Sequence, residues 1–304
     1  MLKFIVRRLL VTVPMVLVVV SLTWGLIRLA PGNFYSGEKP IPPAIVKNIR
    51  EKYGLDKPWY VQYGKMISNT LHGDFGSSLK YQGQPVNTIL RNAMPVSATV
   101  GLLAYFLALI VGIVSGTLAA LRQNSKLDYS SMAVAMLGIS LPNFVLGPML
   151  VLLFSLTWYV LPPALWGSAK HLILPVITLS GVYMAYIARL TRAGMLEVLR
   201  SNYIRTARAK GLSERHVLIH HALRGGLLPV LSFSGPALAF LLTGTVVVER
   251  IFALPGIGNY FINANLNRDE PLIIGIVAFI SIVILAFNLL VDIAYGVVDP
   301  RVRY

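Results

Sequence analysis

The sequence predicts an all-α integral membrane protein with six transmembrane helices. Its 304 residues are 56% hydrophobic and only 13% charged, with a mean hydropathy of +0.68, whereas soluble domains carry about 25% charged residues. Crossing the bilayer core takes about 20 apolar residues, and six segments meet this length. They are Leu9–Ile27, Val96–Leu121, Tyr129–Leu156, His171–Leu190, Leu228–Val248 and Leu272–Tyr295.

The first apolar segment follows Lys3, Arg7 and Arg8, so a cleaved signal peptide is the alternative to a span. Such a peptide has a shorter apolar core and a small-residue cleavage site. Here the apolar run is longer, and Arg28-Leu-Ala-Pro-Gly32 is a poor cleavage site. We therefore predict an uncleaved membrane span.

Basic residues predict the orientation. Lys and Arg concentrate in cytoplasmic loops of membrane proteins, and here they cluster in the N-terminus, in 122–126, in 189–224 and in the tail 300–304. Both termini are therefore expected in the cytoplasm. The net charge of +15 would suggest nucleic acid for a soluble chain, but because these cations flank apolar runs, the expected partner is the bilayer and not nucleic acid.

The long outer loop, residues 28–91, is expected to form a small subdomain of short helices. Pro42–Tyr53 and Pro58–Leu71 have helix-compatible patterns. Each has a proline near its start, which suits a first helical turn because backbone N–H groups there have no partner within the helix. This subdomain would either cover a pore mouth or contact a delivery protein, and the residues do not favour one role.

Segments three to five are interrupted by proline, glycine and hydroxyl residues, for example Leu141-Pro-Asn-Phe-Val-Leu-Gly-Pro148. Such breaks are tolerated where neighbouring helices or a water-filled cavity satisfy the backbone, and small residues permit close helix packing. We assign most of these residues to packing and some to a polar pathway. The pathway candidates are Asn143, Ser232, Ser234, Thr243 and Thr245.

Signatures of catalysis and of nucleotide binding are missing from the sequence. It has no cysteine, no His-Glu-x-x-His, no Gly-x-Ser-x-Gly and no Gly-x-x-x-x-Gly-Lys-[Ser/Thr] phosphate loop. His216, His220 and His221 share a basic loop, but no carboxylate completes a metal site. The acidic residues nearest the spans, Asp128, Glu249 and Asp292, are not at a midplane, which argues against a proton-coupled carrier.

The basic loop between the fourth and fifth segments predicts two short helices that meet at a glycine. Leu196–Lys210 forms the first, Gly211 suits a left-handed C-cap, and Ser213–Leu223 forms the second with Ser213 as N-cap. One interpretation is an amphipathic helix lying on anionic lipid. The other is insertion into a groove of a partner protein, which the small residues near Ala207 favour.

This loop resembles the inner-membrane permease subunits of ATP-binding-cassette importers, in the oligopeptide/dipeptide/nickel group. Tyr203-Ile-Arg-Thr-Ala-Arg-Ala-Lys-Gly-Leu212 and His221-Ala-Leu-Arg-Gly-Gly-Leu-Leu-Pro229 are similar to the peptide group's version of the family loop. Against the family's general pattern only Ala207, Gly211 and Leu223 match.

Other blocks extend the resemblance over essentially the whole chain, and the outer loop is most similar to the first ("B") permease of oligopeptide systems. These blocks are Arg28–Gly32, Gly37–Pro43, His72–Gly76, Glu249–Gly258, Arg268–Pro271 and Val298–Tyr304. The resulting division is a first helix (1–30), an outer helical subdomain (31–94) and a five-helix permease core (95–304) with a coupling loop at 191–226.

The resemblance implies a type I importer in the bacterial inner membrane. This chain and a second, homologous permease would form the pore, two ATP-binding subunits would bind ATP and Mg²⁺, and an extracytoplasmic binding protein would deliver the peptide. This chain would bind no cofactor itself. The implied ATPase-coupling residues are Tyr203, Arg205, Thr206, Ala207, Lys210 and Gly211, and the implied binding-protein contacts are Glu249, Pro255, Gly256, Gly258, Arg268 and Asp269.

Other functions stay open at this point. Within the family the substrate could be a dipeptide, a glutathione-like peptide or nickel. Outside it, a stand-alone secondary carrier or channel would transport without ATPase subunits, and a scaffold or receptor would recruit a cytoplasmic protein without any solute flux. An intramembrane enzyme is disfavoured because its catalytic groups are missing.

Overall fold

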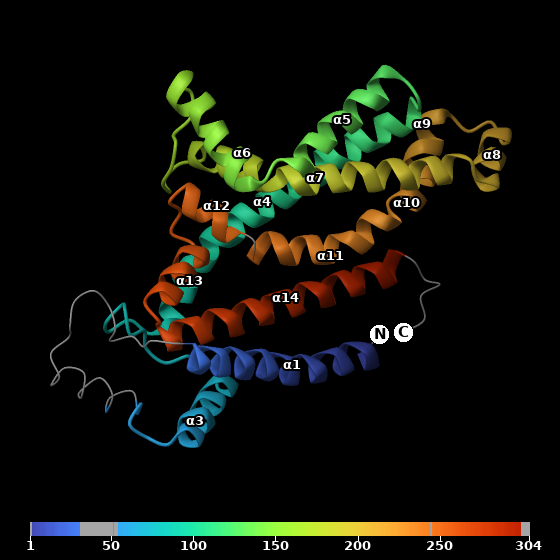
Figure 1. The fold of residues 1–304 in the computed structure, drawn as a ribbon. Coiled ribbons are helices and arrows are strands. Elements are labelled where there is room, and N and C mark those ends of the chain that lie inside the picture. The colour runs from blue at the N-terminus through green and yellow to red at the C-terminus, as the bar shows by residue number, and fades with distance from the viewer. Residues whose placement is uncertain (1, 31–50, 52–53, 244, 299–304) are drawn as a thin grey trace. The chain divides into compact units, whose positions relative to one another are not determined.

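A computed structural model describes residues 2–30, 51, 54–243 and 245–298, and within these ranges the chain is helical with a single isolated β-bridge, Ser77 to Pro85 (Figure 1). Except for Glu51, the predicted helix Pro42–Tyr53 lies outside the described residues, as does the terminal run 300–304. The helices are α1 (Leu2–Leu29), α3 (Trp59–Leu71), α4 (Val86–Leu121), α5 (Lys126–Ser140), α6 (Asn143–Leu150), the π-helix η1 (Val151–Thr157), α7 (Lys170–Leu199), α8 (Asn202–Ala209), α9 (Glu214–His216), the π-helix η2 (Val217–Ala222), α10 (Leu223–Gly226), α11 (Leu228–Thr243), α12 (Thr245–Ile251), α13 (Ile257–Leu266) and α14 (Glu270–Val298).

In the described residues five helical stretches are long and apolar enough to cross a membrane, or six if a bent pair counts as one span. The five are Leu10–Leu29, Val86–Leu121, Lys170–Leu199, Leu228–Ile251 and Glu270–Val291. All five overlap predicted segments, but α4 begins before the predicted start at Val96. Likewise α7 continues past the predicted end at Leu190.

The third predicted segment, Tyr129–Leu156, is not one continuous helix. Lys126–Ser140 and Asn143–Thr157 meet at an angle of 105°. At the break Leu141 has an extended backbone (φ −90°, ψ 111°), and Pro142 follows at φ −62°, ψ 146°. A proline has no N–H to donate and pushes the preceding residue out of the helical region, so the helix ends here.

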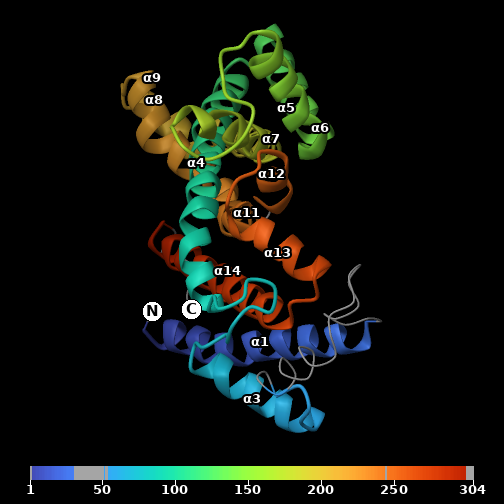
Figure 2. The same ribbon diagram turned by 90° about the vertical axis from the view of Figure 1, so that its left-hand side faces the viewer.

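The described chain divides into two compact units, Met1–Val96 with Pro255–Ala286, and Ser97–Leu254 with Phe287–Tyr304. In the first unit α3 packs on α1 (Figures 1 and 2). Two apolar clusters hold this unit: one joins the start of α4 to α13 and α14, around Val86, Leu90 and Ile276, and the other joins α1 to α14 through Val16, Val20 and Ile274.

Asp269 fixes the outer turn of the first unit to the start of α14. Its buried carboxylate accepts the backbone N–H groups of Leu79 and Lys80, both at 3.0 Å, and that of Leu272 at 3.3 Å. It also accepts the hydroxyl of Ser78. One side chain therefore caps a helix and anchors the segment before α4. A carboxylate is favourable at a helix N-terminus because the helix dipole is positive there.

In the second unit, α4 and α7 approach closely through two glycines four residues apart (Figures 1 and 2). A Cβ at Gly116 would lie 2.4 Å from the carbonyl oxygen of Ala188, and one at Gly112 would lie 2.7 Å from the side chain of Ile187. Only glycine leaves the room for this contact, which is the small-residue packing that membrane helices use.

Candidate functional site

The candidate site is the segment between α7 and α11, residues 200–227, here called the knuckle. The chain leaves α7 at Leu199, turns at Arg200 and Ser201, and forms α8 (Figure 1). Gly211 follows with φ +76°, the left-handed conformation that glycine adopts at little cost. The chain then continues as one helical stretch from Glu214 to Gly226.

The predicted glycine break and the Ser213 N-cap are confirmed, since the Ser213 hydroxyl accepts the His216 N–H at 3.4 Å. The predicted start of the first helix at Leu196 is wrong, because Leu196–Leu199 belong to α7 and a turn separates them from α8. Sequence periodicity could not find this turn, because the pattern is helical on both sides of it.

One face of α8 packs into the protein's own core. Ile204 and Ala207 are buried against Ala120, Met195 and Val217. The knuckle also touches α7 where two glycines meet: a Cβ at Gly194 would lie 2.3 Å from the carbonyl oxygen of Gly226. Ala207, one of the predicted coupling residues, therefore contributes to docking the knuckle on its own chain.

The opposite face of α8 is exposed and basic. Tyr203 is 49% exposed, and Arg205, Thr206, Lys210 and Gly211 are exposed as well. These are the other five predicted coupling residues, and all of them are exposed along α8 or at the turn that follows it. Their role in coupling stays a prediction.

An ion pair that the sequence pattern does not predict bridges the Gly211 turn. The Arg208 guanidinium donates from Nε to Glu214 Oε1 at 2.7 Å and from Nη2 to Oε2 at 3.2 Å. The hydrogen bond to Glu214 raises the pKa of Arg208 above its usual value. Both side chains are solvent-exposed, so the pair orients the two helices more than it stabilises the fold.

The rings of the knuckle histidines lie against one another. The rings of His216 and His220 lie 4.3 Å apart between centroids with an interplanar angle of 17°, and His221 lies edge-on to His216 at 5.8 Å. Within the described part of the chain, no three His, Asp or Glu side chains are placed to hold a metal ion.

A buried ion pair lies where α5 begins beside α7. Arg192 donates from Nε to Asp128 Oδ1 at 2.6 Å and from Nη2 to Oδ2 at 2.8 Å, and the Asn124 N–H donates to Oδ2 at 3.0 Å. The Asp128 side chain is only 2% exposed. Asp128 and Arg192 are 64 positions apart in the sequence, so no local sequence pattern predicts this ion pair.

Three of the five pathway candidates have side chains that the structure describes. Asn143 is half-buried at the start of α6, and its buried Oδ1 has no partner among the described residues. Ser232 is exposed, whereas Ser234 is buried and donates to the Val230 carbonyl at 2.8 Å. The side chains of Thr243 and Thr245 lie outside the described part, so a pathway stays a prediction.

The binding-protein candidates are mostly internal. Glu249 is fully buried and accepts the Ser97 hydroxyl at 2.6 Å, and Asp269 is buried as described above. Gly256 and Gly258 are buried too, while Arg268 is half-buried and Pro255 is exposed. Pro255 and Arg268 are therefore the two candidates with solvent-accessible surface. The role of the whole set stays a prediction.

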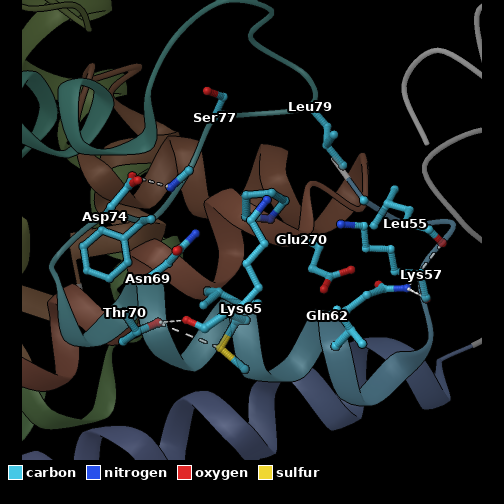
Figure 3. A pocket seen from close by; sticks show the side chains of 17 residues that line it. Leu55, Lys57, Gln62, Lys65, Asn69, Thr70, Asp74, Ser77, Leu79 and Glu270 are labelled. Carbon is cyan, nitrogen blue, oxygen red and sulfur yellow. Dashed lines mark hydrogen bonds between the residues drawn. The ribbon is translucent and has the colours of Figure 1, made fainter. Parts of the chain in front are cut away.

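The first unit contains a pocket of about 450 Å³ between α3, the turn after it and the start of α14. Its polar lining, labelled in Figure 3, includes Lys57, Lys65 and Glu270, with Gln62 and Asn69 contributed by α3. Phe75, Met66 and Ile274 supply apolar walls. The pocket thus presents charges of both signs beside apolar surface, a mixture typical of small-molecule sites.

Sequence comparison extends these observations. The model described as "Binding-protein-dependent transport system inner membrane component" matches residues 109–304, and an N-terminal model of the same kind of system matches residues 1–100. The chain is 45% identical over 306 residues to the oligopeptide transport system permease protein OppB of Escherichia coli K12, covering 100% of both chains. It is 41% identical over 303 residues to the dipeptide transport system permease protein DppB of Bacillus subtilis 168, covering 100% of this chain and 98% of that one.

Structural comparison gives the same fold. A chain of the MetNI methionine ABC transporter in an inward-facing conformation matches 72% of this chain and 100% of its own length, with a TM-score of 0.59 at 15% identity. The helical membrane fold, the two family models and the full-length relatives agree, and the models match all residues except 101–108. This chain belongs to the family of binding-protein-dependent transport system inner membrane components, the multi-pass permeases of bacterial transport systems.

Proposed function

We propose that this chain is the "B"-type permease subunit of an ATP-driven importer that translocates oligopeptides. The observation that supports this most is full-length similarity at 45% identity to a permease named for oligopeptide transport. The described helices supply membrane spans, and the sequence contains no phosphate loop. The energy for transport would therefore come from ATP and Mg²⁺ bound on partner subunits, and this chain would not be an enzyme.

In this proposal the knuckle is the coupling element. Its exposed side, with Tyr203, Arg205 and Thr206, would sit in a cleft of an ATP-binding subunit in the cytoplasm. The buried side, with Ile204 and Ala207, ties α8 to α4 and α7. Movement of the ATPase would therefore pass directly to two membrane helices, in the way rigid elements switch packed interfaces.

The remaining partners follow from the family. A second, homologous permease would complete the pore, and a second ATP-binding subunit would serve it. An extracytoplasmic binding protein would deliver the peptide to the outer side, where Pro255 and Arg268 offer surface. Both termini would lie in the cytoplasm of a bacterial cell, with the chain in the inner membrane.

Purification of the tagged chain from its native membrane in mild detergent tests this proposal. We expect mass spectrometry to find a second permease and ATP-binding subunits, and proteoliposomes of the complex with its binding protein to take up labelled peptides only with ATP. A chain recovered alone that still carries solute would establish a stand-alone carrier instead.

A dipeptide substrate is the second candidate, because the Bacillus subtilis relative named for dipeptide transport is 41% identical over the full length. The two candidates are separated by competition. Excess unlabelled dipeptide should leave labelled oligopeptide uptake nearly unchanged if oligopeptides are the substrate, and should abolish it if dipeptides are preferred.

A further inference from the structure

With the N-terminus in the cytoplasm, as proposed above, the length of α1 indicates where the outer edge of the hydrocarbon core lies. Its apolar stretch, Leu10–Leu29, has 20 residues, which at 1.5 Å per residue span about 30 Å, the thickness of the core. The stretch has no surplus length, so its end must be near the outer boundary. There the Arg28 guanidinium lies over the Trp24 ring at 4.9 Å, a pairing suited to the membrane interface.

Helix α3 packs on α1 below that boundary. Its residue Gln62 accepts a hydrogen bond from Arg28, but Tyr63 reaches further in, where its hydroxyl lies 2.8 Å from that of Ser21. Ser21 is eight residues before Leu29, which corresponds to a depth of about 12 Å along the helix.

A second contact places α3 beside two candidate membrane spans. Met66 packs against the apolar cluster that contains Val16 and Val20 of α1 and Ile274 of α14. Each of these three residues lies within an apolar stretch long enough to span a membrane. Figure 3 shows α3 lying over α1 in this region.

The side of α3 turned away from α1 and from the pocket carries no charge. Tyr60, Gly64, Ser68 and Leu71 are exposed and recur at helical spacing. Tyr60 is 61% exposed and Leu71 is 57% exposed. Lys65, the charged residue among the exposed side chains of α3, lies at the edge of this face and lines the pocket.

We propose that α3 is embedded in the outer leaflet of the bilayer, with Tyr60, Gly64, Ser68 and Leu71 facing lipid. The outer subdomain then does not stand wholly in water above the membrane, because part of it enters the leaflet beside α1. A lipid partner follows from the depth of Ser21 and from the uncharged face. It also follows from α1, whose apolar window is only 17% buried within the protein and so is mostly left to lipid.

Nitroxide labels on single cysteines test this directly, because the chain has no cysteine of its own. Tyr60→Cys, Gly64→Cys, Ser68→Cys and Leu71→Cys would each be labelled in the complex, reconstituted in phosphatidylethanolamine–phosphatidylglycerol vesicles. We expect oxygen, which concentrates in lipid, to relax these labels more than a water-soluble nickel chelate does. Leu22→Cys, at an exposed apolar position of α1, is the lipid control, and Asp56→Cys is the water control.

Two results would overturn the proposal. Stronger relaxation by the nickel chelate at the four positions would place the face in water, and weak relaxation by both agents would show that another protein covers it. Labelling of the unmodified complex measures the background from cysteines of partner subunits. Because each of the four positions is exposed and is substituted separately, misfolding of one variant leaves the other three to decide.

Discussion

The buried ion pair between Asp128 and Arg192 leads to the sharpest stability prediction. Its two charge-assisted hydrogen bonds, at 2.6 and 2.8 Å, join the first turn of α5 to α7. The two partners are unequally buried: the Asp128 side chain is 2% exposed, and that of Arg192 is 27% exposed. The cost of removing one partner should therefore depend on which charge is left behind.

Removing one partner of a buried pair costs about 3–5 kcal/mol. Asp128→Asn should fall near the lower value, because Arg192 can turn part of its guanidinium to solvent. The loss for Arg192→Met should fall near the upper value, because the buried Asp128 carboxylate then keeps the hydrogen bond from the Asn124 N–H but loses its cationic partner. The double variant removes both charges, so its loss should be well below the sum of the single losses.

Thermal unfolding in detergent, followed by the fluorescence of the four tryptophans, measures these differences. At about 2–4 °C per kcal/mol, Arg192→Met should lower Tm by about 10–20 °C. Arg189→Met, an exposed arginine of the same helix, is the matched control and should change Tm little. Equal losses from the two single variants, or additive losses in the double variant, would refute the reasoning.

Three further predictions concern glycines and the knuckle. Gly116→Ala places a Cβ 2.4 Å from the Ala188 carbonyl and should destabilise the protein by about 1–3 kcal/mol. Gly64→Ala, with no atom near its added Cβ, is the control and should leave the stability unchanged. Equal Tm values for the two variants would contradict this prediction. Gly211→Pro cannot adopt φ +76° and should uncouple transport, so that ATP hydrolysis by the complex continues while peptide uptake is lost; normal ATP-dependent uptake would contradict this. Arg208→Met should leave Tm nearly unchanged because its pair with Glu214 is exposed, and a large loss would show that this pair does more than orient the turn.

The sequence by itself determined the membrane class, the approximate spans and the break at Gly211. These features depend on local properties: the length of an apolar run, the special backbone freedom of glycine and the capping hydroxyl of Ser213. The family followed from motifs contiguous in sequence, which is why the resemblance was visible before any contact was known.

Only the tertiary structure decided which side chains of those motifs face outward. In the folded chain Ala207 packs in the core, and Glu249 and Asp269 are buried with internal partners. Asp128 pairs with Arg192, and α3 packs against α1. Each of these outcomes depends on residues far apart in the sequence, and a burial pattern is set by what packs opposite a residue. Periodicity shows that a helix has two faces, whereas the packing of the other helices selects the face that is covered.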